Sequence, residues 1–157
     1  MSKIVGKAKK KSPSKHFEMP VAVHLVLLKG KEVLLLLRQN TGFCDGSYSV
    51  IAGHLDGGES STAAMVREAF EEADIVVRPK DMAFSCIVHR FSPDRESIDL
   101  FYVCKKWKNE ICNKEPHKCG GLRFFPVNKL PKNMVPYVRE GIARSLSPKP
   151  YCEIGWN

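Results

Sequence analysis

A glycine-rich loop that runs directly into a short helix constrains this chain more than any other stretch. Gly53, Gly57 and Gly58 supply the loop, and hydroxyl residues at 60–62 can cap the first free N–H groups of a helix. Four apolar residues then recur at helical spacing and are predicted to form the buried face of that helix: Val66, Ala69, Phe70 and Ala73. Residues 53–75 are therefore predicted to be a tight loop followed by a packed helix.

The same helix carries glutamates at i, i+3 and i+4, namely Glu68, Glu71 and Glu72. Like charges at this spacing cost about 0.2–0.5 kcal/mol per pair, and acidic residues in a last turn face the negative end of the helix dipole. A solvated acidic face is the simpler interpretation of such a cluster alone. The glycine loop before it and Arg67 beside it favour a site for a hard divalent cation, because Mg²⁺ takes oxygen ligands and bridges them to phosphates.

Residues 53–75 resemble the Nudix box, G-x5-E-x7-R-E-U-x-E-E-x-G-U, in which U is aliphatic. The positions in register are Gly53, Glu59, Arg67, Glu68, Glu71, Glu72 and Ile75. Ala69 is smaller than the usual aliphatic residue, and Asp74 stands where the box has glycine. Asp tolerates the left-handed conformation that ends a helix better than most residues, so the resemblance to the Nudix family holds.

The resemblance implies an α/β/α Nudix sandwich with a mixed sheet, and it implies roles for the box residues. Glu71 and Glu72 are expected to be the main ligands of Mg²⁺, with Mn²⁺ as an alternative cation. Glu68 is expected to be a ligand or a general base, and the carbonyl of Ala52 to complete the coordination. Arg67, counted with the catalytic residues, is expected to pair with Glu59 and hold the loop against the helix.

A weaker resemblance, covering residues 20–147, points to the MutT-like nucleoside triphosphate diphosphatases. Arg38 ends an apolar run and matches a phosphate-contacting arginine. Residues 113–119 look like the E-P-x-K-C segment of that branch, which implies that Glu115 joins the metal ligands. Glu110 is the competitor in the same loop, and both can be merely solvated. Residues 122–125 lack the tryptophan that these sequences often carry there.

Other polar and aromatic residues have two interpretations each. Gly53, His54 and Tyr48 are assigned to substrate binding, although His54 is as readily structural. Tyr48, Phe101 and Phe125 can stack on a base, yet aromatic residues in strands are more often core. His24 is more often a core or pocket-wall histidine than a ligand. Surface or strand-end positions are predicted for His89, Asp94 and Asp99.

The order of elements is α+β. Apolar, β-branched runs predict strands at 20–28, 32–37, 48–51, 82–90, 98–105 and 122–127, with a hairpin turn at 29–31 and a long loop at 107–121. A second helix is predicted at 135–146, with Val138, Ile142 and Leu146 on one face. This order predicts a mixed sheet with helices packed against it.

The net charge of +8 is concentrated at the N-terminus, where residues 1–17 carry six lysines and no acidic residue. We predict a disordered basic tail over 1–17, followed by a Nudix hydrolase domain over 18–157. The tail can touch nucleic acid or another anionic surface, but a solubilising segment without a partner is the simpler interpretation.

The six cysteines form no C-x-x-C pair and no zinc spacing, which indicates a reducing compartment. No apolar run approaches the roughly 20 residues that span a bilayer, and no apolar segment adjoins the basic N-terminus as a secretory signal requires. We therefore expect a cytoplasmic protein. Its oligomeric state stays open, with a homodimer as one option.

These features predict an enzyme that uses Mg²⁺ to hydrolyse a nucleoside triphosphate to a nucleoside monophosphate and pyrophosphate. A dinucleotide or nucleotide-sugar pyrophosphatase is the alternative within the same chemistry. A catalytically inactive module that binds nucleotide or RNA is a second alternative, but such relatives usually lose a glutamate of the box and none is lost here.

Overall fold

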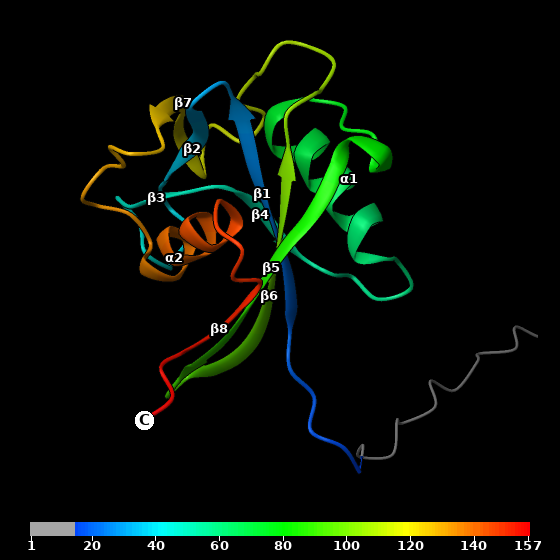
Figure 1. The fold of residues 1–157 in the computed structure, drawn as a ribbon, viewed down its shortest axis with the longest axis vertical. Helices are drawn as coiled ribbons and strands as arrows, with labels where there is room; N and C mark the ends of the chain where they lie inside the picture. The colour runs from blue at the N-terminus through cyan, green and yellow to red at the C-terminus, as the bar shows by residue number, and fades with distance from the viewer. Residues whose placement is uncertain (1–14) are drawn as a thin grey trace, which may run out of the picture.

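The computed structural model describes residues 15–157, and these form a mixed β-sheet between helices (Figure 1). The strands are β1 (Val21–Lys29), β2 (Glu32–Arg38), β3 (Tyr48–Ser49), β4 (Ile51–His54), β5 (Met82–Ser92), β6 (Arg95–Cys104), β7 (Cys119–Pro126) and β8 (Tyr151–Ile154). The helices are α1 (Ser61–Ala73), the 3₁₀ turn η1 (Pro79–Asp81) and α2 (Pro136–Ser145).

The sheet divides along β1. The first half of β1 pairs antiparallel with β4, from Ala22–His54 to Leu25–Ile51, whereas its end pairs antiparallel with β2 at Leu28–Val33 and Lys29–Glu32. On its other side β1 runs parallel to β6, which pairs with β5, and β5 pairs with β8. β2 pairs antiparallel with β7 along its length, from Glu32–Pro126 to Arg38–Cys119, and its far part also pairs with β3 at Leu36 and Leu37. Two strand groups thus diverge from one strand.

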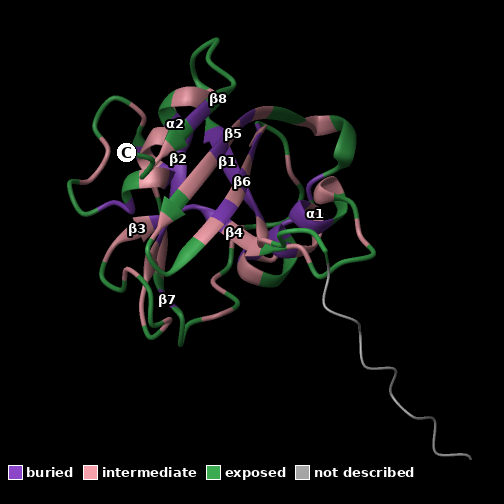
Figure 2. Ribbon diagram, turned by 90° about the horizontal axis from the view of Figure 1, so that it is seen from below, coloured by how far each residue is buried: buried purple, intermediate pink, exposed green. Residues whose placement is uncertain are grey.

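Helices cover both faces of the sheet, as the resemblance implies, with α1 and α2 on opposite sides (Figures 1 and 2). The alternation of side chains along β1 divides the core accordingly. Val23, Leu25 and Leu27 pack under α1, whereas Val26 and Leu28 pack under α2. The predicted α/β/α sandwich with a mixed sheet is confirmed.

Helix α1 begins and ends at the residues expected from its sequence. The Ser60 hydroxyl accepts a hydrogen bond from the Ala63 N–H at 3.1 Å. At the other end Asp74 takes the left-handed conformation, with φ 59°, and its N–H donates to the Phe70 carbonyl at 3.0 Å. Asp74 therefore ends the helix as the expected glycine would.

The buried face of α1 differs from the prediction. Phe70 is 47% exposed and lies beneath the ammonium of Lys114, 5.3 Å from its ring centroid. The fully buried positions are instead Ala64, Met65, Ala69 and Ala73. Alanines let the helix approach the sheet closely, and such an approach leaves no room for a phenylalanine on this face.

Helix α2 packs through Val138 and Ile142 as predicted, but Leu146 is 46% exposed and the prediction for it is wrong. Gly141 makes the closest approach to the sheet, since a Cβ at this position would lie only 2.1 Å from Cζ of Phe101. The helix therefore lies almost directly on the Phe101 ring.

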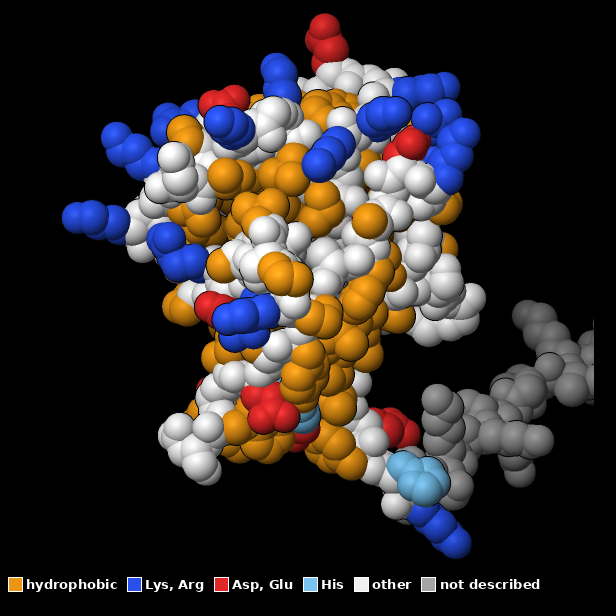
Figure 3. Space-filling model, in the orientation of Figure 1, with side chains coloured by type: hydrophobic (Ala, Val, Ile, Leu, Met, Phe, Trp, Pro, Cys, Tyr) orange, Lys and Arg blue, Asp and Glu red, His pale blue; other side chains and the backbone are white. Residues whose placement is uncertain are grey.

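Most predicted strands are present, and the turn at 29–31 is confirmed by Gly30 at φ 60°. Residues 151–154 were not predicted as a strand, yet β8 pairs parallel with β5. The tail prediction falls largely on residues 1–14, which lie outside the described residues. On the described surface, Lys and Arg side chains gather over the upper part of the face shown in Figure 3.

All six cysteines are free, in line with the absence of paired spacing in the sequence. Within residues 15–157, no helix has the length and apolar character needed to cross a membrane.

Candidate active site

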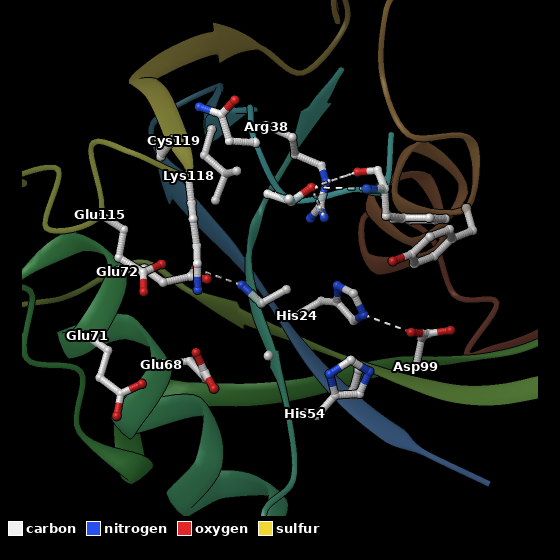
Figure 4. Close-up of a pocket in the computed structure, with 18 of the residues that line it drawn as sticks. His24, Arg38, His54, Glu68, Glu71, Glu72, Asp99, Glu115, Lys118 and Cys119 are labelled. Carbon is white, nitrogen blue, oxygen red and sulfur yellow. Dashed lines mark hydrogen bonds and ion pairs between the residues drawn. The ribbon is translucent and has the colours of Figure 1, made fainter. Parts of the chain in front are cut away.

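A cavity of about 600 Å³ lies where the sheet divides. Its walls come from the start of β1, from β4, from the ends of β2 and β7 that face each other, and from α1 (Figure 4). The residues at the wall include both expected and unexpected ones: Ala22, His24, Leu36, Arg38, Asn40, Thr41, Phe43, Ala52, Gly53, His54, Glu68, Glu71, Glu72, Arg90, Arg95, Asp99, Glu115, Lys118, Cys119, Leu122 and Tyr137.

Arg67 ties the glycine loop to α1. It donates two hydrogen bonds to Glu59, from Nη2 at 2.7 Å and from Nε at 3.2 Å, so the expected pairing is present. Nη2 also donates to the His54 carbonyl at 3.2 Å, and Nη1 donates to Glu68 at 2.7 Å. These bonds raise the pKa of Arg67, with Glu59 contributing most, and Arg67 in turn lowers the pKa of Glu59. Arg67 thus fixes the loop and one carboxylate together.

Glu68 lies against the backbone of Gly53. A Cβ on Gly53 would be 2.0 Å from Cδ of Glu68, so only glycine leaves room for the carboxylate at this position. Burial raises the pKa of Glu68, and the hydrogen bond from Arg67 opposes the rise. The position of Gly53 in the motif is therefore explained by the side chain that it accommodates.

Glu72 carries the most perturbed carboxylate of the site. Its Oε2 accepts a hydrogen bond from the Ala52 N–H at 3.0 Å. Burial raises the pKa of Glu72 well above the usual value, and the neighbouring carboxylates of Glu68 and Glu115 raise it further. A carboxylate in this condition favours a proton or another cation nearby.

Glu71 extends from the next turn and is 52% exposed, with a 3.4 Å contact to Arg67. Within residues 15–157, no three His, Cys, Asp or Glu side chains already converge on one point as a metal site requires. The chemistry of the donors nevertheless fits Mg²⁺ or Mn²⁺, because every candidate ligand is an oxygen and the buried Glu72 carboxylate is held by a backbone N–H rather than by a cation. Figure 4 shows Glu68, Glu71, Glu72 and Glu115 on one side of the cavity.

The loop before β7 brings Glu115 and Lys118 to the cavity. The N–H groups of Lys118 and Cys119 donate to the Glu115 carbonyl at 2.9 and 2.8 Å, so the segment forms a compact turn. Glu110 is exposed and does not line the cavity. Of the two competing loop carboxylates, Glu115 is the one that faces the other glutamates.

Cations form the wall opposite the glutamates. Arg38 is held by hydrogen bonds from Nε to the Phe43 carbonyl at 2.8 Å and from Nη2 to Thr41 Oγ1 at 2.9 Å. Its guanidinium lies 5.4 Å from the centroid of the Phe43 ring. Arg90 stacks on Tyr137, with 4.0 Å between its Cζ and the ring centroid. One cavity therefore offers carboxylates on one side and guanidinium groups on another.

Asp99 is 1% exposed, so its predicted place among surface or strand-end groups is wrong. Its carboxylate accepts from His24 Nε2 at 2.9 Å, from Ser97 Oγ at 3.0 Å and from Arg90 Nε at 3.3 Å. Burial works to raise the pKa of Asp99, but His24, Arg90 and Ser97 together hold it below the usual value. The parallel register of β1 and β6 brings these strands together, which the sequence alone does not reveal.

The remaining expected residues separate into two groups. His54 lines the cavity with Gly53 and Arg38, and His24 lies in its wall. Tyr48 does not line the cavity; its ring packs edge-on against Phe125, with centroids 4.9 Å apart. Phe101 is fully buried, Asp94 is exposed at its turn, and His89 is partly exposed and pairs with Glu96 at 2.9 Å.

Sequence reasoning did not single out several residues of the cavity wall, among them Asn40, Thr41, Phe43, Arg90, Arg95 and Tyr137. Thr41 and Phe43 belong to the loop at 39–47, where the Asp45 carboxylate accepts from the N–H groups of Thr41 and Gly42 at 3.0 and 2.9 Å. Gly42 and Gly46 are typical of a loop, but nothing in their spacing indicates which side chains the loop presents to the cavity.

Comparison with known proteins identifies relatives by sequence. A family model described as NUDIX domain matches residues 18–145. An ADP-ribose pyrophosphatase of Methanocaldococcus jannaschii is 28% identical over 134 residues, which cover 83% of this chain and 75% of that protein. The NAD-capped RNA hydrolase NudC of Stutzerimonas stutzeri is 30% identical over 122 residues, covering 78% of this chain but only 41% of that protein.

Solved structures share the fold. The MutT NUDIX hydrolase of Burkholderia pseudomallei superposes with a TM-score of 0.75 over 82% of this chain and 98% of that one, at 19% sequence identity.

Proposed function

The chain belongs to the NUDIX family, and from this membership we propose that it hydrolyses the diphosphate linkage of a nucleoside diphosphate joined to a second group, such as a sugar. Hydrolysis of diphosphate linkages is the chemistry of this family. The observation that carries the proposal is a single cavity with carboxylates on one side and guanidinium groups on the other. The similarity to an ADP-ribose pyrophosphatase over most of both chains supports the choice of substrate class.

The glutamates of α1 would hold the metal. Glu71 and Glu72 would supply carboxylate oxygens for Mg²⁺ or Mn²⁺, together with the Ala52 carbonyl on β4. Bound there, the cation would neutralise the charge that keeps a nucleophile from the diphosphate and would stabilise the leaving phosphate. The neighbouring negative charges of these glutamates destabilise the helix when no cation is present, but they would provide the ligands that a cation needs.

Glu68 is the candidate general base. Burial raises the pKa of its carboxylate, which makes it a better acceptor for the proton of an attacking water. Arg67 holds it by a 2.7 Å hydrogen bond, and Gly53 leaves the space that it occupies. Arg67 acts as a positioning residue in this proposal because its guanidinium contacts Glu59, Glu68 and the His54 carbonyl.

Arg38 and Lys118 would bind the phosphates that the glutamates do not reach. Both line the cavity, and hydrogen bonds to Phe43 and Thr41 fix the guanidinium of Arg38 in advance. A guanidinium held in this way loses little conformational entropy when an anion binds.

A nucleoside triphosphate, cleaved to a monophosphate and pyrophosphate, is the second candidate substrate. The loop segment that resembles the MutT-like diphosphatases presents both Glu115 and Lys118 to the cavity, which favours a third phosphate beside them. The two candidates share the metal site and differ in what extends beyond the diphosphate.

Product analysis distinguishes the candidates. The purified chain is incubated with Mg²⁺ and either ADP-ribose, NADH or a nucleoside triphosphate, and the products are separated by ion-exchange chromatography. AMP with ribose 5-phosphate supports the proposal, whereas a nucleoside monophosphate with pyrophosphate supports the second candidate. Nucleotide binding without any Mg²⁺-dependent cleavage would contradict both and indicate a binding module.

Glu115→Gln is expected to raise the Mg²⁺ concentration needed for half-maximal activity, by about threefold to tenfold, and to lower kcat less than changes in α1. Its carboxylate comes from a loop, so ordering that loop around a cation costs conformational entropy. Titration of activity against Mg²⁺ measures the effect.

Glu110→Gln is the matched control from the same loop and is expected to be silent, because Glu110 does not line the cavity. The opposite ranking of the two variants would assign the role to Glu110. Two silent variants would show that the box glutamates act without the loop.

A further inference from the structure

His24 has one ring nitrogen without a partner. Its side chain is 2% exposed, and Nδ1 is the buried polar side-chain atom that finds no hydrogen bond within the described residues. Nε2, in contrast, is engaged with the Asp99 carboxylate at 2.9 Å. A buried polar atom without a partner costs free energy, so its presence in a cavity wall indicates a ligand that supplies the missing partner.

The hydrogen-bond network decides what Nδ1 can accept. Asp99 already receives hydrogen bonds from Ser97 and Arg90, so its carboxylate acts as an acceptor and Nε2 of His24 must carry the proton. In the neutral imidazole this leaves Nδ1 with a lone pair and no hydrogen. The ligand group opposite it is therefore an N–H or O–H donor.

The surroundings of Nδ1 are aromatic. The imidazole stacks on Phe101 with centroids 4.6 Å apart, and Tyr137 meets it edge-on at 5.7 Å. Tyr137 and Phe43 both line the cavity, and Arg90 lies over the Tyr137 ring. In Figure 4 the free ring nitrogen of His24 points away from Asp99, toward the side of the cavity where Arg38 lies.

We propose that this end of the cavity is the subsite for the nucleobase of the substrate, and that His24 Nδ1 selects bases that carry an amino group by accepting a hydrogen bond from it. The inference rests on the proposed function, because it places the nucleoside of that substrate. A flat, aromatic ring suits walls made of ring faces and a guanidinium plane, whereas a sugar hydroxyl gains little from them.

Two substitutions of His24 test the roles of Nδ1 and Nε2 separately. His24→Gln places an amide N–H near the position of Nε2 and retains a donor to Asp99, but removes the acceptor at Nδ1. His24→Asn places an amide oxygen near Nδ1 and loses the donor to Asp99. His89→Gln is the control, because His89 pairs with Glu96 and does not line the cavity.

Binding is measured by calorimetry in EDTA, so that the result does not depend on hydrolysis. The probes are pairs of nucleoside monophosphates that differ at an amino group: AMP and purine riboside monophosphate, GMP and IMP, CMP and UMP. For at least one pair, the wild type is expected to prefer the amino form by about tenfold, which is the value of one hydrogen bond in a buried site. His24→Gln is expected to abolish this preference, and His24→Asn to retain part of it.

Three results would overturn the inference. The first is that the preference for the amino form survives in His24→Gln, and the second is that the wild type binds both members of every pair equally well. The third is that His24→Gln instead removes a preference for nucleotides with a 2′- or 3′-hydroxyl over their deoxy forms, which would assign Nδ1 to a sugar hydroxyl. Thermal unfolding of each variant checks that the fold persists. Because binding is measured without turnover, a protein that discriminates amino groups but cleaves nothing would support the subsite and contradict the proposed hydrolysis.

Discussion

Glu72→Gln is expected to lower kcat by about a hundredfold to a thousandfold and, without metal, to raise the melting temperature. The amide can still accept the hydrogen bond from the Ala52 N–H that Glu72 accepts at 3.0 Å, so the backbone contact persists. The negative charge that a divalent cation requires is lost. Steady-state kinetics at saturating Mg²⁺, with thermal unfolding in EDTA, measures both effects.

The stabilising effect has a defined dependence on pH. Burial raises the pKa of folded Glu72 well above its ordinary value of 4.5, so the ionised form of Glu72 opposes folding. As the pH falls through the folded pKa, the folded carboxyl takes up a proton and this penalty shrinks. The advantage of Glu72→Gln is therefore full above the folded pKa and disappears as the pH falls to the ordinary value of the unfolded carboxyl.

Mg²⁺ supplies the converse measurement. The cation should raise the melting temperature of the wild type, because it binds the folded state and offsets the charge of the carboxylates, and should raise that of Glu72→Gln less. A variant that keeps near wild-type turnover, or that loses stability in EDTA, would contradict the role given to this carboxylate.

Gly53→Ala is expected to lower kcat by about tenfold to a hundredfold with little change in the fold. The new Cβ would overlap the Glu68 carboxyl carbon, at 2.0 Å, so that side chain must leave its position and its hydrogen bond with Arg67. The end of a side chain moves more readily than backbone, so the damage should fall on catalysis rather than on folding.

Gly121→Ala is the matched control, because a Cβ on Gly121 meets no atom within 4 Å. It is expected to retain wild-type activity. If both variants behaved alike, the contact between Gly53 and Glu68 would not be what makes glycine necessary at that position. A crystal structure of Gly53→Ala would show directly where Glu68 moves.

The motif made one half of the site predictable. Residues 53–75 form one continuous segment, and within α1 the spacing of three to four residues places Glu68, Glu71 and Glu72 on one face. The Arg67–Glu59 hydrogen bonds and the left-handed end at Asp74 follow from the same local geometry. Contacts can be predicted from the sequence where all of the residues belong to one continuous segment.

The other half depends on contacts between distant segments. His24 and Asp99 meet because β1 and β6 run parallel, and the sequence contains no signal for that register. The exposure of Phe70 and Leu146 has a similar origin, since close packing of Ala69 and Gly141 rather than helical periodicity decides which side chains reach the core. Strand β8 was not predicted because its few residues form a strand through pairing with β5, a distant segment of the chain.

The two strand groups of the sheet are joined by the paired ends of β1 and β2 and by the core beneath α2, and their other edges lie apart at the cavity. A ligand that contacts β4 and α1 in one group and β2 and β7 in the other would therefore connect the two groups. Rigidity and affinity are then linked: the more the groups move relative to each other without ligand, the more of the binding free energy is used to fix their arrangement.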